Sequence, residues 1–135
     1  MAHAIAAAEV ERRGLAVSVW SAGTWDFEGE WAAIDARLTC ERHDTPMPKL
    51  LATYLANLDL SDATRVFVME RAHLTQVLAQ TNLPALRVCL LGAFDPEKGD
   101  EEIADPIGNP AAFESCYIRM RDAIRHYLDT TEDFK

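Results

Sequence analysis

Three cysteines and one Asp-Pro pair are the residues of this sequence whose chemistry could serve catalysis. Cys40, Cys89 and Cys116 could supply a nucleophilic thiolate, but they are odd in number and show no Cys-x-x-Cys spacing. Reduced, mostly buried thiols are the simplest interpretation. Asp105 directly precedes Pro106 and could act as a general acid. Asp-Pro is also a frequent turn pair, and Asp is favoured where a helix begins, so the residue types alone leave both interpretations open.

The remaining polar residues point to no cofactor. The four histidines lie far apart, and none is paired with a cysteine or a second histidine at the spacing of metal ligands. We therefore expect no metal site and no cofactor. Six carboxylates lie between Asp95 and Asp105, opposed only by Lys98. This run could steer basic peptides, but a solvated, flexible loop is the simpler prediction.

The elements that must position these residues alternate between helix and strand. Apolar runs predict strands at Leu15–Trp20, Arg65–Met69 and Arg87–Gly92. Helical spacing and stop signals predict helices at 2–13, 31–43 and 49–57, around 74–78, and from residue 109 or 110 onward. Continuous apolar strands separated by helices are typical of a parallel sheet covered on both faces. The sequence therefore predicts a single α/β domain over residues 1–135, a three-layer α/β/α sandwich around a small parallel sheet.

Length and charge limit the classes of function. A chain of 135 residues fits one domain, and its net charge of −9 argues against non-specific binding of nucleic acid. No apolar run approaches the roughly 20 residues that span a bilayer. The first residues are alanine-rich but lack a basic leader, so we expect no membrane association and a cytoplasmic protein.

Four stretches, taken in order, resemble the low molecular weight protein tyrosine phosphatases over essentially the whole chain. They are SAGTWDFEG (Ser21–Gly29), RVFVMERAH (Arg65–His73), VCLLG (Val88–Gly92) and the Asp105-Pro106 pair. The resemblance implies hydrolysis of phosphotyrosine, in a protein or a small phosphoester, through a phosphocysteine intermediate.

The same resemblance implies roles for individual residues. Asp105 would be the general acid that protonates the departing phenolate. The hydroxyl of Ser21 would support the phosphate-binding loop, or else make only a hydrogen bond within a turn. Trp25 and Phe27 would line the mouth of the substrate site, or else anchor their own loop on the domain. The family often has an aromatic residue where this sequence has Ile107, so the substrate preference stays open.

The family signature, Cys followed by five residues and Arg, does not occur in these 135 residues. The positions six after the three cysteines are Pro46, Asp95 and Asp122. Met1 and Ala2 match the start of the helix that follows the family's phosphate loop. The resemblance therefore implies that the nucleophile and the first, central strand are missing, and we expect the chain as given to be inactive. The alternative is that Met1 is an internal methionine of a longer protein.

A missing central strand would leave unpaired strand edges. Leu15–Trp20 could move to pair directly with Arg65–Met69, or two chains could form a homodimer through the exposed edges. Two other functions remain open. One is a non-catalytic pseudophosphatase that serves as an interaction module. The other is an arsenate reductase-like activity, which would need the same nucleophile and additional resolving cysteines.

Overall fold

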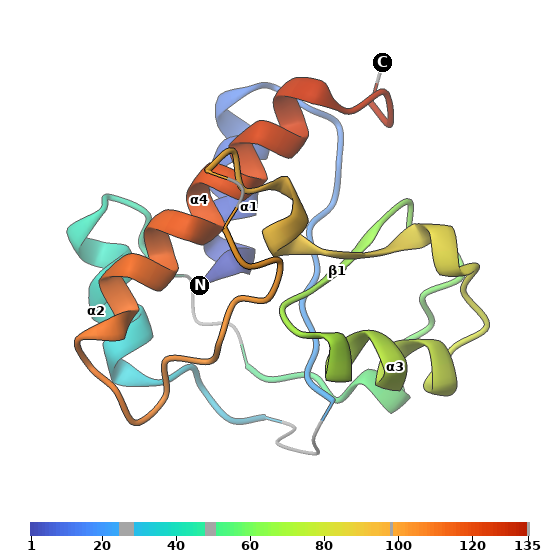
Figure 1. Cartoon of the computed structure of the whole chain (residues 1–135), viewed down its shortest axis with the longest axis horizontal. Helices are drawn as coiled ribbons and strands as arrows, with labels where there is room; N and C mark the ends of the chain where they lie inside the picture. Colours follow the sequence, from blue (N-terminus) through green and yellow to red (C-terminus); the bar gives the residue numbers. More distant parts are fainter. Residues whose placement is uncertain (25–28, 48–50, 98, 135) are drawn as a thin grey trace.

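Four α-helices and two short strands form the framework of the part that the computed structural model describes, residues 1–24, 29–47, 51–97 and 99–134 (Figure 1). The helices are α1 (Ala2–Arg12), α2 (Ile34–Arg42), α3 (Arg71–Gln80) and α4 (Ala112–Thr130). Short 3-10 turns η1 (Leu55–Asn57), η2 (Ala85–Arg87) and η3 (Leu91–Phe94) connect them with the strands β1 (Val66–Val68) and β2 (Val88–Leu90). No helix among these residues is long and apolar enough to cross a membrane.

The sheet consists of β1 and β2, which run parallel with Val66 opposite Val88 and Val68 opposite Leu90. Helix α3 connects the two strands. Phe67 of β1 packs with the cluster formed by α1, α2 and α4, whereas Val68 belongs to the cluster under α3. The sheet therefore has helices on both faces, and the predicted α/β/α layering with a small parallel sheet is confirmed.

Two separate hydrophobic clusters lie on the two faces of the sheet. The larger one unites residues from α1 to α4, and its most buried members include Ile5, Cys40 and Ala123. The smaller one centres on Leu55, Val68, Val77 and Val88. Helix α4 buries one face, as its apolar periodicity predicted. Five residues of this face belong to the larger cluster (Cys116, Tyr117, Met120, Ala123, Ile124), and Phe113 and Tyr127 are buried beside them.

A buried carboxylate joins the first and last helices. Glu9 of α1 is only 5% exposed, and its Oε1 accepts a hydrogen bond of 2.7 Å from Nε of Arg125 in α4. Its Oε2 accepts from Arg12 and Arg13. Burial acts to raise the pKa of Glu9, but the hydrogen bonds from Arg12 and Arg125 outweigh it and hold the pKa below its usual value.

The predicted strand at Leu15–Trp20 does not form. The segment runs as an uncoiled trace (Figure 1). Leu15, Val17 and Val19 are half-buried and the residues between them are exposed. Among the described residues, 16–22 make no hydrogen bond with another backbone group. Among the described residues β1 pairs with β2 alone, so the alternative in which Leu15–Trp20 moves to pair with Arg65–Met69 is not what the structure shows. Alternating polarity favours an extended backbone, but a strand also needs a neighbour for its backbone groups.

The predicted helix at 49–57 is also wrong. Its first residues, 49 and 50, lie outside the described residues, and the rest of the segment is extended up to η1. Leu51 forms an antiparallel bridge with Trp31, and Tyr54 forms a parallel bridge with Gly23. The Ala52 N–H donates to the Glu30 carbonyl at 2.6 Å. Helical spacing of apolar residues was misleading here, because the backbone groups of this segment are used by the chain around Gly23 and Trp31. Only the turn η1 is helical.

Helix α2 forms as predicted but presents a different face. Ile34 and Leu38, whose spacing indicated the helix, are 53% and 43% exposed. The buried residues are Ala36, Thr39 and Cys40. Small side chains therefore make the contact with the larger cluster, and the apolar stripe faces outward.

Candidate active site at the start of helix α1

The first turn of α1 contacts the Ser21 loop. Nδ1 of His3 lies 2.7 Å from the Ser21 hydroxyl. Leu15 meets the other end of the helix, because its N–H donates to the Val10 carbonyl at 3.0 Å. The chain therefore runs back along α1 between these two contacts and brings Ser21 to the N-terminal end of the helix. This end carries free backbone N–H groups and a partial positive charge, which favour anions.

His3 is held towards its neutral form. Burial lowers the pKa of His3, and the positive charge of the Met1 amino group lowers it further. In a neutral imidazole, Nδ1 can either accept a hydrogen bond from the Ser21 hydroxyl or donate one to it, depending on the tautomer. The contact therefore supports Ser21 without adding a cation to the site.

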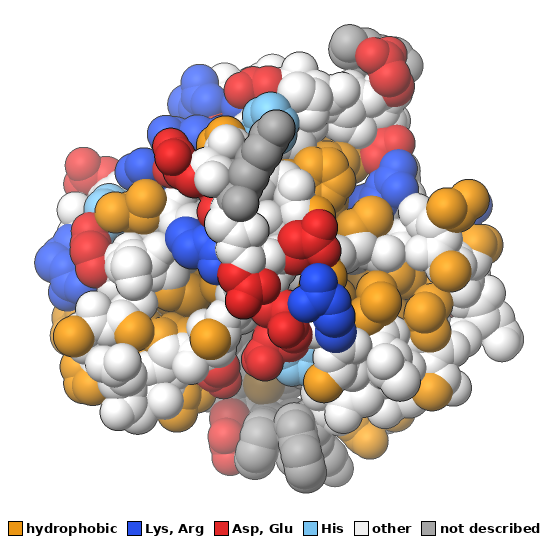
Figure 2. Space-filling model, in the orientation of Figure 1, with side chains coloured by type: hydrophobic (Ala, Val, Ile, Leu, Met, Phe, Trp, Pro, Cys, Tyr) orange, Lys and Arg blue, Asp and Glu red, His pale blue; other side chains and the backbone are white. Residues whose placement is uncertain are grey.

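The acidic loop between η3 and α4 is tied to the body of the molecule by Arg119 of α4. Its Nε donates to Asp95 at 3.0 Å, and Nη1 donates to the Glu102 carbonyl at 2.9 Å. Nη2 donates to the Asp100 carbonyl. Acidic side chains gather over this loop near the middle of the face seen in Figure 2. The loop is therefore folded around an arginine, contrary to the prediction of a merely solvated, flexible segment.

Contacts with η3 and β1 complete the fixation of this loop. Gly92 lies so close to the loop that a Cβ on it would be 2.1 Å from the Glu101 carbonyl oxygen. The N–H of Ile103, a residue only 2% exposed, donates to the Met69 carbonyl at 2.9 Å. Residue 103 is therefore fixed just after β1 ends, two residues before Asp105.

Asp105 is an exposed carboxylate on a short turn. Its Oδ1 accepts a hydrogen bond of 3.0 Å from the N–H of Ile107, and the intervening Pro106 is buried. Ile103, two residues before Asp105, belongs to the same buried cluster as Ala4 and Ile5 of α1, against which Met1 also packs. The loop that carries Asp105 therefore lies near the N-terminal end of α1, the end that Ser21 contacts. A fixed, accessible carboxyl of this kind can donate a proton to a leaving group.

The two cysteines at this end are poorly suited to act as nucleophiles. Cys40 is fully buried and Cys116 is 6% exposed. Burial raises the pKa of both thiols, and the nearby Met1 amino group offsets this only in part. The thiolate is the reactive form, so a raised pKa lowers nucleophilicity. Across the described ranges, no group of three or more His, Cys, Asp or Glu side chains could hold a metal ion.

Comparison of the sequence with models of protein families identifies the family of this chain. The family described as "Low molecular weight phosphotyrosine protein phosphatase" matches residues 1–133. The chain belongs to this family. The assignment made from the four sequence stretches is therefore confirmed. No curated protein sequence matches the chain significantly.

Solved structures of phosphatases share the fold. The tyrosine phosphatase amsI of Erwinia amylovora is 21% identical, with a TM-score of 0.85 over 97% of this chain and 83% of that one. The low molecular weight protein tyrosine phosphatase of T. tengcongensis is 20% identical, with a TM-score of 0.85 over 96% and 88%. Wzb of Vibrio vulnificus, solved with benzylphosphonate, is 17% identical, with a TM-score of 0.82 over 96% and 88%.

The residues predicted for the site fall into two groups. Ser21 contacts the first turn of α1 and the loop that carries Asp105 packs near the same end of this helix, whereas Trp25 and Phe27 lie outside the described residues. Sequence reasoning missed His3 and Arg119, which hold the Ser21 loop and the Asp105 loop. No spacing rule links His3 to Ser21. An arginine on α4 opposite a run of carboxylates was a signal that could have identified Arg119.

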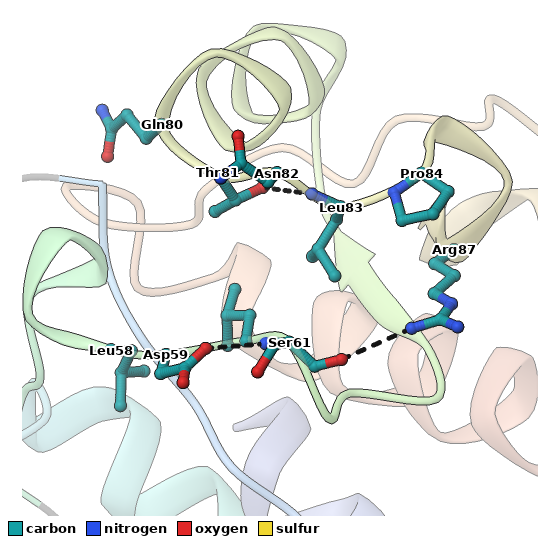
Figure 3. Close-up of a pocket in the computed structure, with 10 residues that line it drawn as sticks. Leu58, Asp59, Ser61, Gln80, Thr81, Asn82, Leu83, Pro84 and Arg87 are labelled. Carbon is teal, nitrogen blue, oxygen red and sulfur yellow. Dashed lines mark hydrogen bonds between the residues drawn. The ribbon is translucent and has the colours of Figure 1, made fainter.

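A separate cavity of about 420 Å³ lies at the other end of the strands (Figure 3). Its walls are the segment before β1, including Asp59 and Ser61, and the segment between α3 and β2, including Thr81 and Arg87. Ligand sites of open parallel sheets lie at the carboxyl ends of the strands. This cavity is at the amino ends, away from Asp105, and is not part of the candidate site.

Proposed function

We propose that the site at the start of α1 serves the family reaction, hydrolysis of a phosphomonoester such as phosphotyrosine, with Asp105 as the general acid. The observation that carries this proposal is the position of Asp105, exposed on a fixed loop at the N-terminal end of α1. Ser21 would support the phosphate-binding loop through its hydroxyl, and Trp25 and Phe27 would line the substrate mouth. The substrate would be a phosphotyrosine protein or a small phosphoester.

The 135-residue chain by itself would not hydrolyse a phosphomonoester. Such a reaction needs a thiolate that attacks phosphorus and an arginine that holds the phosphoryl oxygens. These 135 residues contain no Cys-x5-Arg sequence, and the buried thiols of Cys40 and Cys116 have raised pKa values. A general acid contributes about 10²–10⁴-fold and cannot replace a nucleophile.

The first test is hydrolysis of p-nitrophenyl phosphate by this chain and by a form extended upstream with whatever the gene encodes. We expect activity in the extended form alone. There, Asp105→Ala should lower kcat by about 10²–10⁴-fold, whereas Glu97→Ala, a change of an exposed acid in the same loop, should have little effect. Full activity of the extended Asp105→Ala variant on substrates with poor leaving groups would contradict the role of Asp105.

A non-catalytic pseudophosphatase is the second candidate. It is favoured by the lack of a Cys-x5-Arg sequence in these residues together with the burial of two of the three thiols. A stop codon directly upstream of the Met1 codon, or inactivity of both forms, would support it. An arsenate reductase-like activity has less support, because buried cysteines are poor resolving thiols.

Location and partners complete the proposal. We propose a cytoplasmic protein, since the three cysteines are free thiols. For the unpaired backbone edges we propose a second copy of the chain as the partner.

A further inference from the structure

Arg119 of α4 lies at the centre of the loop that leads from η3 to Asp105. Its guanidinium group donates to the Asp95 carboxylate at the start of the loop and to the carbonyls of Asp100 and Glu102 further along. One planar group therefore holds the loop at three separate points. An arginine can do this because its donors form a rigid fork, whereas a lysine offers a single point charge.

The carboxylate at the start of the loop is buried. Asp95 is 7% exposed, and both of its oxygens accept hydrogen bonds: Oδ2 from Nε of Arg119 at 3.0 Å and Oδ1 from the Glu97 N–H at 3.0 Å. The loop passes close to this ion pair, since a Cβ at Gly99 would be 3.8 Å from Asp95 and 3.9 Å from Arg119. Removing the arginine would leave a buried carboxylate unpaired, which is unfavourable enough to displace the loop.

The far end of the loop is held next to the end of β1. Ile103 is buried, and its N–H donates to the Met69 carbonyl at 2.9 Å. It directly follows Glu102, whose carbonyl accepts from Arg119. Asp105 comes two residues later. All of these contacts lie within residues 69–119, and they constrain the backbone up to the carboxyl assigned as the general acid.

We propose that Arg119 is a positioning residue for the general acid: by holding the loop at three points, it fixes where Asp105 presents its carboxyl to the leaving group. This inference rests on the proposed function, because positioning matters to the rate only if Asp105 donates a proton. A proton donor must stay within hydrogen-bond reach of the leaving oxygen, and a displacement of about 1 Å can cost on the order of 10²-fold in rate.

Loss of positioning has a kinetic signature that loss of folding does not share. A general acid contributes more when the leaving group is more basic. Phenyl phosphate releases a more basic phenolate than p-nitrophenyl phosphate does, so a displaced acid slows its hydrolysis more. A variant that only lowers the folded fraction of the protein lowers the rate with both substrates by the same factor.

The first experiment compares the two substrates in the form of the chain extended upstream. We expect Arg119→Gln to lower kcat at least about tenfold with phenyl phosphate, and less with p-nitrophenyl phosphate, at unchanged KM. Combined with Asp105→Ala, the same substitution should cause no further loss, because the group that it positions is gone. Equal losses with both substrates, or a full additional loss in the combined variant, would overturn the proposal.

Arg121→Gln is the matched control. The side chains of Arg119 and Arg121 are 30% and 29% exposed on the same helix, but Arg121 pairs with its neighbour Asp122. Arg121→Gln should leave kcat with both substrates unchanged. If it reproduced the effect of Arg119→Gln, the contacts with the loop would not be the cause.

Arg119→Lys separates the geometry of the guanidinium from its charge. This variant keeps a cation beside the buried Asp95 carboxylate, so the fold is retained, but one ammonium group cannot hold three acceptors in the same arrangement. We expect it to show the same preferential loss with phenyl phosphate as Arg119→Gln. Full kcat in Arg119→Lys would contradict the proposal, because a charge alone would then be sufficient.

Amide hydrogen exchange on the 135-residue chain tests the contacts without turnover. Arg119→Gln should speed exchange at the N–H groups of Glu102 and Ile103 at least about tenfold and leave that of α3 unchanged. Unchanged exchange at both residues would overturn the proposal. The two assignments fail in different ways. A normal rate in Asp105→Ala removes the general acid itself, whereas a slow Asp105→Ala beside a normal Arg119→Gln removes only the role of Arg119.

Discussion

Asp105 and Ser21 illustrate what single residues of this chain contribute. Both were identified from short stretches of sequence, and the structure brings them to one end of α1. The residues that hold them in place were not predicted from the sequence. His3 makes a hydrogen bond with Ser21, and Arg119 makes one with Asp95 in the loop that carries Asp105. Sequence reasoning finds residues whose types suit the chemistry. It does not find supporting contacts that depend on how distant segments pack.

The thiols should differ in reactivity according to burial. Cys89 is half-buried, whereas Cys40 and Cys116 are buried with raised pKa values. With Ellman's reagent at neutral pH we expect one fast thiol and two slow ones, because the reagent needs both access and thiolate. Cys89→Ser should remove the fast phase, and all three thiols should react together in denaturant. A fast phase that survives Cys89→Ser would show that one of the buried thiols is accessible.

At the scale of elements, the loop that carries Asp105 depends on the close approach of Gly92 to Glu101. A methyl group at position 92 would collide with the Glu101 carbonyl, which is backbone and can move only with the loop. We expect Gly92→Ala to lower the free energy of unfolding by about 1–3 kcal/mol, as overpacking does. Urea denaturation measures this change.

Gly99→Ala is the control for that substitution. The nearest atoms to a Cβ at position 99 are side-chain atoms of Asp95 and Arg119, 3.8 and 3.9 Å away, which is ordinary contact. We therefore expect Gly99→Ala to be nearly neutral. If both variants lost stability equally, crowding at Gly92 would not be the cause.

Helices and strands were predictable from sequence where the local pattern of apolar residues and stop signals is enough to determine the element. The helices α1, α3 and α4 and the strands β1 and β2 follow their apolar periodicity and stop signals, including Gly14 with its positive φ of 65° after α1. The predicted strand at 15–20 and the predicted helix at 49–57 do not form, because the conformation of these segments depends on backbone partners far away in the chain. For α2, periodicity predicted the helix but not the face that it buries.

At the scale of the whole molecule, Asp133 joins the C-terminal tail to the start of β1. Its carboxylate accepts hydrogen bonds of 2.9 and 3.1 Å from Arg65 and one of 2.5 Å from the Tyr127 hydroxyl. The hydrogen bond from Arg65 and then that from Tyr127 lower the pKa of Asp133 below 3.8. The unfolded chain therefore binds a proton at Asp133 more readily than the folded chain does.

The pH dependence of stability follows from this difference. Stability contributed by Asp133 is fully present above pH 3.8 and is lost as the pH falls through the lower, folded pKa. We expect Asp133→Asn to lower the free energy of unfolding by about 1 kcal/mol at pH 6 and to reduce its loss on acidification. Urea denaturation at a series of pH values measures both effects. Asp62→Asn, at an exposed position, should change neither, and an unchanged acid profile of Asp133→Asn would contradict the role of the contact.

The two hydrophobic clusters differ in how much chain each must close to assemble. The α3 cluster has its buried members between Leu55 and Val88, whereas the larger cluster joins Ala4 of α1 to Ile124 of α4. Loop-closure entropy grows with the number of residues between the ends, by roughly 0.6 kcal/mol for each doubling. Forming the β1–α3–β2 unit therefore costs less chain entropy than forming the larger cluster. The end of the molecule that carries Asp105 can assemble only when the N-terminal and C-terminal helices have packed together.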